Sequence, residues 1–535
     1  MPSYIESKEP QITLADGGST EYSIVLAANA TNSERTAARE LVEYLWKVTG
    51  VAFEMVNESS IVKPEKKIFV GPTEYAVANG IRIDELDEEE WIIRTTESNL
   101  ILTGGRPRGT LYAVYHFLED IIGVHWWNPF EEHVPNKPYL YICNNLDFQD
   151  KPVLSYRDIY TLYGDDNGRF ATRNRLNRQG DARISSEYGG YEMYGPPYHV
   201  HTFNRYIIAE EHFEDNPEWF ALVNGKREVW QLCLTNEDLK SYFLGELKKN
   251  IQQSKENAER AGYPMPYIFN VSQNDSSGAC ECVNCRAVVE AEEAESGLIL
   301  SFVNYLAEHI EDEYPNVYID TLAYSWSMQP PKTIKPRDNV IIRLCNGRGG
   351  SNRQKPLTHP DNSEFRGLLD KWKSITKNLA IWEYSATYGD YADLPNPIIQ
   401  TYPDYFRYYV KNNLRGVFME LQHSVIGDMR DLKVWITMKL LENPYLEYES
   451  LLLTFTEGFY GAAGKYIREY MKELEEAALA YGAKLHYFPT LEDHGYIDLD
   501  FAIKAIKIFE TAEEAVKNDS TLLRRVRHAR ISLDR

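Results

Sequence analysis

The sequence predicts an α/β protein built around a (β/α)8 TIM-like barrel, with an N-terminal α/β accessory domain and a C-terminal helical region. Two observations lead to this fold class. Short apolar runs alternate with helical stretches through the middle of the chain, and the pattern becomes purely helical after about residue 430. The 535 residues also exceed the roughly 250 that one barrel needs. We expect domains at residues 1–150, 151–430 and 431–535.

The accessory domain is predicted from strand and helix patterns that precede Pro152. The segments YSIVLA and KKIFVG have the composition of strands. The segment SERTAARELVEYLWKVTG has apolar residues at helical spacing and stops at Gly50. After it, EWIIRTTESNLILTGG predicts two strands, and RGTLYAVYHFLEDIIG predicts a helix that ends at Gly123.

The barrel is predicted from eight β-rich runs, several of them separated by clear helices. Continuous apolar strands that alternate with helices indicate a parallel sheet covered on both faces. A barrel of seven or nine strands is the alternative. The runs are 153–160, 198–207, 230–236, 267–275, 317–326, 339–347, 379–387 and 416–424.

The composition of the chain restricts the classes of molecule that the protein is expected to bind. The chain has 57 Lys and Arg against 80 Asp and Glu, a net charge of −23, which repels phosphate backbones and argues against nucleic acid. No run approaches the roughly 20 apolar residues of a membrane span, and the polar start has no signal-sequence pattern. We therefore expect a soluble protein, either cytoplasmic or secreted with its leader removed, and leave a homo-oligomer open. The 38 Tyr, 20 Phe and 10 Trp fill cores, but their faces can also stack on sugar rings.

Polar side chains gather at the predicted strand ends, where barrels place their active sites. Asp275 ends the fourth run, Glu383 lies near the end of the seventh, and Glu420 lies in the eighth, so these three acids are the catalytic candidates. Each could instead cap a helix or neutralise an arginine. The candidates for substrate binding are Asn274, Arg157, His201, Trp326, Arg343, Asn346, Trp382, Tyr384 and His423.

Two carboxyl groups on either side of a sugar are the requirement of glycoside hydrolysis. One protonates the leaving oxygen, and the other stabilises or attacks the oxocarbenium centre. Asn274-Asp275 and Glu383 resemble the Asn-Glu acid/base and the Glu nucleophile on strands four and seven of many retaining barrel glycosidases. Here Asp replaces Glu, and its shorter side chain reaches less far. This chemistry needs no cofactor.

Cys280, Cys282 and Cys285 form a C-x-C-x2-C motif just after Asp275, and Cys233 at the end of the third run is the natural fourth ligand. Four thiolates at these spacings suit a closed tetrahedral zinc site, which would be structural because no position is left open. An iron–sulfur cluster and free or disulfide-bonded cysteines are the alternatives.

Several segments resemble known families. Residues 102–135 are similar to the small α/β domain that precedes the barrel in family 20 hexosaminidases and family 67 α-glucuronidases. Five other segments resemble the uncharacterised domain family 4838, part of which is classed as glycoside hydrolase family 163, acting within the chitobiose core of N-glycans. They are NPEWFALVNGKRE, QLCLTNEDL, VSQNDSSGACECVNC, LRGVFMELQHS and MKLLENPYLEYESLLLTFTEGFYGAAGKYIREYM.

The second resemblance carries over to three features: Asp275 of the Asn-Asp strand end, the cysteine motif, and Glu420 as the acid after GVF. In acetamido-sugar hydrolases of related architecture, the substrate's own acetamido group can be the nucleophile. That implies that Asn274 and Asp275 divide orientation and proton donation, or that Glu383 or Glu420 is the acid.

We therefore expect a glycoside hydrolase whose first substrate is a β-N-acetylglucosaminide in a complex glycan. One alternative is a uronic-acid glycosidase, in which Arg157 and Arg343 could hold the substrate carboxylate. The other is a catalytically silent glycan-binding protein on a barrel scaffold.

Overall fold

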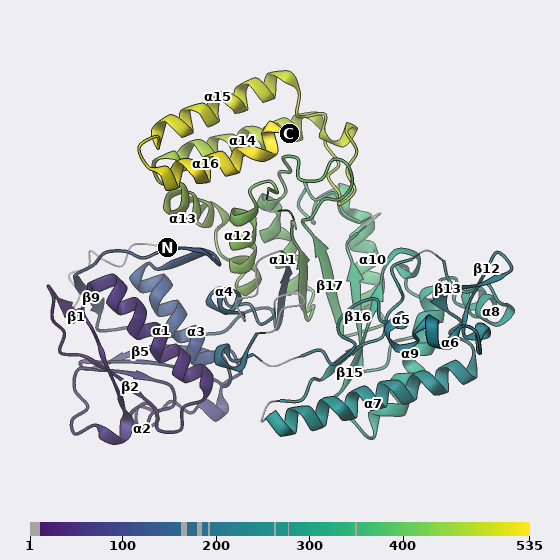
Figure 1. The fold of residues 1–535 in the computed structure, drawn as a ribbon, viewed down its shortest axis with the longest axis horizontal. Coiled ribbons are helices and arrows are strands. Elements are labelled where there is room, and N and C mark those ends of the chain that lie inside the picture. Colours follow the sequence, from purple (N-terminus) through teal and green to yellow (C-terminus); the bar gives the residue numbers. More distant parts are fainter. Residues whose placement is uncertain are drawn as a thin grey trace.

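The computed structural model describes residues 11–161, 168–178, 184–190, 193–261, 264–276, 278–347, 350–422, 424 and 426–535. The chain forms three parts that meet around a central sheet (Figure 1). An N-terminal α/β unit is drawn in purple and blue, a parallel sheet with its helices in teal and green, and a helical C-terminal region in yellow-green. Among the described residues, no helix combines the length and apolar character that crossing a membrane requires.

The N-terminal unit is a six-stranded mixed sheet in the order β10-β5-β6-β4-β2-β3. Its long helix α1 begins at a capping box of Thr31 and Glu34 and ends at Gly50, whose φ of 74° is the left-handed conformation that favours glycine. The predicted strands and helices of this unit are confirmed. Its main elements are β2 Ser23–Leu26, α1 Asn32–Thr49, β3 Glu54–Asn57, β4 Lys67–Val70, β5 Trp91–Thr96, β6 Asn99–Gly104, α3 Gly109–His116 and β10 Asp147–Asp150.

Smaller elements complete this unit. The strands β1 Gln11–Asp16 and β9 Tyr139–Cys143 form an antiparallel pair, as do β7 His125–Asn128 and β8 Glu131–His133. The short helix α2 spans Glu74–Ala78, and the helix α3 continues as a π-helical turn over Phe117–Ile122.

The central sheet has six parallel strands in the order β11-β18-β17-β16-β15-β14. Six of the eight predicted runs contain these strands. They are β11 Tyr156–Tyr160, β14 Ile268–Asn270, β15 Tyr318–Ala323, β16 Val340–Cys345, β17 Leu379–Tyr384 and β18 Gly416–Glu420. The helices that accompany them are α7 Glu237–Ala261, α8 Val283–Glu292, α9 Ser296–Glu311, α10 Ser363–Lys373 and α11 Tyr402–Lys411.

The eight-stranded barrel needs correction at its second and third strands. The second run is not a strand, because Tyr198 and His201 have φ values of 79° and 51°, which an extended strand cannot adopt. Its later residues form the short helix α5 Phe203–Tyr206. The third overlaps β13 Lys226–Leu232, which pairs with β12 Phe220–Val223 as a separate hairpin. Single-residue bridges from Arg178 to β11 and from Tyr194 to β14 extend the sheet on both sides. The described sheet is thus a curled parallel half-barrel.

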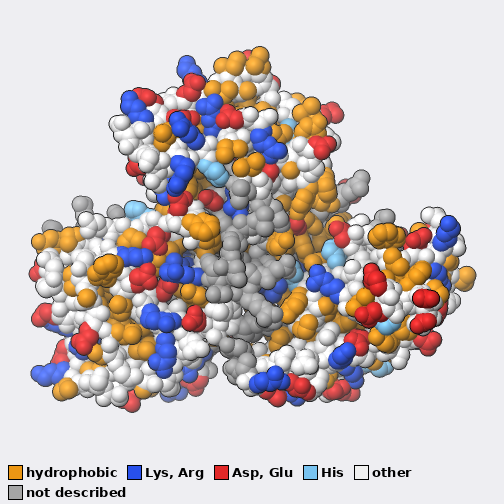
Figure 2. All heavy atoms as spheres, in the orientation of Figure 1, with side chains coloured by type: hydrophobic (Ala, Val, Ile, Leu, Met, Phe, Trp, Pro, Cys, Tyr) orange, Lys and Arg blue, Asp and Glu red, His pale blue; other side chains and the backbone are white. Residues whose placement is uncertain are grey.

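The C-terminal region is helical, as predicted, and lies above the sheet in Figure 1. It consists of α12 Arg430–Glu442, α13 Tyr448–Tyr460, α14 Gly464–Tyr481, α15 Leu499–Ala515 and α16 Ser520–Asp534. In the space-filling view, acidic and basic side chains are interspersed over the outer faces, and hydrophobic side chains gather where this region approaches the sheet (Figure 2).

Candidate active site

The pleat of the parallel strands sorts their side chains onto two faces. On β17, Trp382 and Tyr384 join an aromatic cluster with Phe418 of β18. The residue between them, Glu383, is in register with Met419, which packs in the main core on the other face. The inner face of the half-barrel therefore holds the aromatic cluster, and the outer face packs against helices.

Glu420 ends β18 on the inner face, in register with Tyr384. It is 9% exposed, and its carboxylate accepts a hydrogen bond of 2.8 Å from Trp382 Nε1 and a second from the hydroxyl of Tyr388. Donors that point at a carboxylate favour its ionised form. The Glu420 carboxyl group is therefore held by two donors in a largely apolar, aromatic enclosure.

Part of the enclosure comes from loops that sequence patterns did not single out. Tyr388 follows β17, and its backbone N–H donates to the carbonyl of Tyr487, which lies between α14 and α15. The ring of Tyr487 stacks on that of Tyr384, with centroids 4.8 Å apart. Neither Tyr388 nor Tyr487 lies in a periodic segment, and the only signal for them was the richness of the chain in tyrosine. The C-terminal helical region thus contributes directly to the site.

Asp275 borders the same aromatic cluster from the β14 side. Its side chain is exposed, and the Tyr324 hydroxyl donates to Asp275 Oδ1 at 3.2 Å. Burial, and then the charge of Asp275, raise the pKa of Tyr324, so this hydroxyl stays protonated and remains a donor. Tyr324 also packs against the cluster that contains Trp382 and Tyr384. Asp275 and Glu420 therefore lie on two sides of one aromatic-lined region.

His201 lies beside Tyr324, with ring centroids 5.8 Å apart. Its Nδ1 is 2.7 Å from the carbonyl of Gln273, an acceptor that fixes the proton on this nitrogen. His201 therefore lies beside the tyrosine that donates to Asp275. Its role in substrate binding stays a prediction.

Glu383 and Asn346 are placed away from this region. Glu383 is 2% exposed, and its carboxylate accepts hydrogen bonds from Asn346 Nδ2 at 2.9 Å, Arg353 Nε at 3.2 Å and the Tyr409 hydroxyl at 2.6 Å. The Tyr384 N–H also donates to Glu383 Oε1, at 3.1 Å. Glu383 and Asn346 thus belong to one buried network, a placement that favours a structural role for both, and their catalytic and binding roles stay predictions.

The two predicted carboxylate-binding arginines are both buried. Arg157 is fully buried and pairs with Glu89 of the N-terminal unit at 2.8 Å, so its charge already has a partner. Arg343 is 1% exposed, pairs with Asp320 at 3.1 Å and contacts the hydroxyl of Tyr194, but its Nε and Nη1 have no hydrogen-bond partner among the described residues. A role in holding a substrate carboxylate stays a prediction for both arginines.

Asn274 and Trp326 shape the segment that carries Asp275. The Asn274 amide donates to the carbonyl of Trp230 at 2.9 Å and accepts from the Asn204 N–H at 3.0 Å, and these two bonds fix its orientation. Trp326 Nε1 donates to the carbonyl of Ser276 at 3.2 Å. Both hold the loop in place, and His423 lies outside the described residues.

The four predicted cysteines come together. The sulfur atoms of Cys233, Cys280, Cys282 and Cys285 all lie within 4.8 Å of one another, and Cys233 Sγ is 3.6 Å from Cys282 Sγ and 3.9 Å from Cys285 Sγ. Zinc bonds of about 2.3 Å in a tetrahedron imply sulfur separations of about 3.8 Å. The Leu222 N–H lies 3.2 Å from Cys280 Sγ, a donor suited to a thiolate. The donor set and its spacing fit a four-thiolate metal.

Comparison with known proteins identifies the family and the fold. Residues 126–472 match the family model described as Domain of unknown function (DUF4838), and residues 14–117 match the N-terminus of glycosyl hydrolase family 67, so both resemblances are confirmed. No curated protein matches the chain in sequence.

Three solved structures are similar at low identity. The family GH115 4-O-methyl-α-glucuronidase BtGH115A, with specificity for decorated arabinogalactans, is 13% identical with a TM-score of 0.58 over 98% of this chain and 70% of its own. CpGH84B is 10% identical with a TM-score of 0.52 over 98% and 86%. The GH20 exo β-N-acetylglucosaminidase from Vibrio harveyi is 11% identical with a TM-score of 0.49 over 89% and 77%. The first two share the fold of this chain.

Proposed function

The chain belongs to the DUF4838 family, a domain of unknown function, and within that family we propose that it is a glycoside hydrolase acting on a complex glycan. The observation that carries the proposal is the pair of carboxylates, Asp275 and Glu420, on two sides of one aromatic region at the strand ends. The match of the N-terminal unit to family 67 and the fold shared with a GH115 enzyme support it.

The two acids suit different tasks. Glu420 receives two hydrogen bonds that favour its charge, so it can stabilise a positive oxocarbenium centre or, when close enough, attack it. Asp275 is exposed, so the glycosidic oxygen of a bound glycan can reach its carboxyl group. In this mechanism Asp275 gives its proton to the glycosidic oxygen as the bond from that oxygen to the anomeric carbon breaks. Water then adds to the anomeric carbon and returns a proton to Asp275.

The first substrate in this proposal is a β-N-acetylglucosaminide. Its acetamido oxygen could supply the nucleophile, in which case Glu420 acts only by its charge. Beyond its two backbone hydrogen bonds the Asn274 amide keeps one N–H and one lone pair, so Asn274 and Tyr324 are polar groups next to Asp275 that could orient the acetamido group. The second candidate, a uronic-acid glycosidase, is favoured by the GH115 glucuronidase fold and by the two nitrogens of Arg343 that have no hydrogen-bond partner among the described residues, whereas Arg157 is paired with Glu89.

A panel of glycans tests the proposal. Purified protein is incubated with N-glycans, N,N′-diacetylchitobiose and glucuronic-acid-capped oligosaccharides, and the products are analysed by anion-exchange chromatography and mass spectrometry. We expect release of N-acetylglucosamine-terminated products. Release of uronic acid instead would favour the second candidate, and binding without release from any substrate would favour a catalytically silent glycan-binding protein.

We also propose that the cysteine group holds a structural zinc ion. Cys233, Cys280, Cys282 and Cys285 would occupy all four tetrahedral positions, so the ion would take no part in the reaction. Its task would be to fasten the β12–β13 hairpin, which Cys233 follows, to the loop that continues from Asp275.

A further inference from the structure

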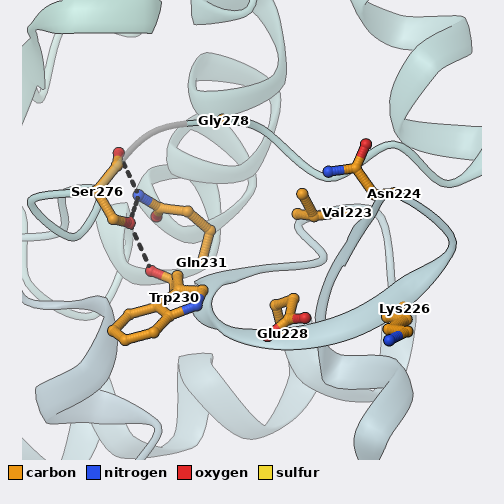
Figure 3. Close-up of a pocket in the computed structure, with 8 residues that line it drawn as sticks. All are labelled: Val223, Asn224, Lys226, Glu228, Trp230, Gln231, Ser276 and Gly278. Carbon is orange, nitrogen blue, oxygen red and sulfur yellow. Dashed lines mark hydrogen bonds between the residues drawn. The ribbon is translucent and has the colours of Figure 1, made fainter.

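A pocket of about 560 Å³ lies between the β12–β13 hairpin and the chain that follows Asp275 (Figure 3). Its volume is within the range of about 300–1,000 Å³ that is typical of small-molecule sites. The close-up shows the hairpin residues Asn224, Lys226, Glu228 and Trp230 along one side, and Ser276 and Gly278 on the other. We call this the hairpin pocket.

Trp230 is the largest side chain of the hairpin pocket, and it is 62% exposed. Its backbone is nevertheless fixed, because its carbonyl accepts hydrogen bonds from Asn274 Nδ2 at 2.9 Å and from Ser276 Oγ at 3.0 Å. An indole on a fixed stretch of backbone, with most of its surface in water, is a platform on which the apolar face of a sugar ring can stack.

Gln231 joins the two walls of the pocket at their base. It is 2% exposed, and its Nε2 donates to the Asn274 carbonyl at 2.8 Å and to Ser276 Oγ at 2.9 Å. Its Oε1 accepts from the Asn274 N–H at 3.2 Å. Asp275 stands between these two bonded residues, so the pocket wall and the candidate acid are held as one unit.

We propose that the hairpin pocket binds the leaving-group portion of the glycan, with the Trp230 indole stacked on a sugar ring. This inference rests on the proposed function: the acid protonates the oxygen of the leaving sugar, so the binding site of that sugar must begin close to the acid. The pocket is lined by Ser276, the residue after Asp275, and offers the charges of Lys226 and Glu228 and the amide of Asn224 to hydroxyl groups. The substrate class that follows is an oligosaccharide with at least one sugar beyond the scissile bond.

The test compares Trp230→Ala and Trp230→Phe with Trp46→Ala, a control because Trp46 on α1 is similarly exposed, at 56%, and lies in the N-terminal unit. Binding of chitotetraose to the full chain is measured by isothermal titration calorimetry. Turnover is measured on an oligosaccharide and on the glycosyl fluoride of the same sugar, which has no leaving-group ring.

We expect Trp230→Ala to weaken chitotetraose binding and to lower kcat/KM on the oligosaccharide by about tenfold or more, the loss typical of truncating an aromatic anchor. Trp230→Phe should recover part of both, and the fluoride and Trp46→Ala should be unaffected. No binding of chitotetraose by the wild type, or equal losses on both substrates, would overturn the inference. Trp230-dependent binding without any turnover would keep the subsite and refute the hydrolase.

Discussion

Glu383 and Glu420 stand near the ends of neighbouring strands, yet their carboxylates lie on opposite faces of the sheet. The register pairs Glu420 with Tyr384 on the inner face, and Glu383 with Met419 on the outer face. Successive side chains of a strand point to opposite faces of the sheet, so a shift of one residue decides which face an acid occupies. This alternation separates Glu420, the candidate catalytic acid, from Glu383, which is buried on the outer face.

At this scale we predict that Glu383→Gln destabilises the fold by about 3–5 kcal/mol, because it leaves Arg353, 4% exposed, buried without its charged partner. Urea unfolding followed by circular dichroism measures the change. The control is Asp275→Asn, an exposed position that should change the free energy of unfolding by less than about 0.5 kcal/mol. Equal stability of Glu383→Gln and the wild type would contradict the structural role.

The sequence placed the three acids at strand ends but did not give the direction of their side chains. Asp275 and Glu420 were predicted at strand ends, and the structure places both beside the aromatic cluster. Glu383 and Asn346 were predicted there too. The boundaries of a predicted strand are uncertain by at least one residue, so the sequence does not say which face of the sheet each side chain occupies. Tyr487 was missed because it reaches the site from some 70 residues beyond β18 in the chain, and no local pattern encodes such a contact.

At the scale of elements, the β12–β13 hairpin is bonded to the loop that contains Cys280 and Cys282, and the two segments together form one structural unit next to the hairpin pocket. The Leu222 carbonyl accepts from the Glu281 N–H at 2.7 Å, and the Asn224 N–H donates to Glu281 Oε2 at 2.9 Å. The hairpin is thus joined to the loop by a backbone hydrogen bond and a side-chain hydrogen bond. The proposed zinc ion would add bonds to the four cysteines.

We therefore predict one zinc ion per chain, measured by inductively coupled plasma mass spectrometry of the purified protein. Cys285→Ser should lose the ion and increase amide hydrogen exchange in residues 220–236 and 278–285, because the ligand set is incomplete. Cys143→Ser is the matched control, since Cys143 is a buried cysteine outside the group. Protein without zinc, in which all four thiols titrate freely, would contradict the proposal.

Some helices and strands can be predicted from local sequence patterns, and others cannot. Helices with caps and strands with long apolar runs were predicted, because local periodicity and burial agree in them. The run at 198–207 misled because its alternating aromatic and polar residues resemble a strand, whereas backbone bonds from Thr202 and Phe203 to the Ser272 carbonyl hold it as a turn. Such long-range bonds leave no periodic signal.

At the scale of the molecule, buried charges join the N-terminal unit to the central sheet. Glu89 pairs with Arg157 of β11 at 2.8 Å and with Arg108 at 2.7 Å. Burial alone would raise the pKa of Glu89, but the two guanidinium groups, Arg157 before Arg108, lower it to about 2.

This pairing makes the junction sensitive to acid. Because the folded-state pKa of Glu89 is below its ordinary value of 4.5, the pairing stabilises the fold above that pH. We predict that about 3 kcal/mol is lost as the pH falls from 4.5 towards 2. Urea midpoints across this range measure it, and Glu89→Gln should lose part of the pH dependence. Identical pH profiles for the variant and the wild type would refute this role for Glu89.

The central claim is that Asp275 and Glu420 perform the chemistry and Glu383 does not. The most direct measurement is kcat of Asp275→Asn, Glu420→Gln and Glu383→Gln on the best glycan substrate, normalised to the folded fraction by circular dichroism. We predict losses of about 10²–10⁴-fold for Asp275→Asn and Glu420→Gln, and a change of less than about threefold for folded Glu383→Gln. Unchanged turnover in Asp275→Asn or Glu420→Gln, or a loss confined to Glu383→Gln, would contradict the account.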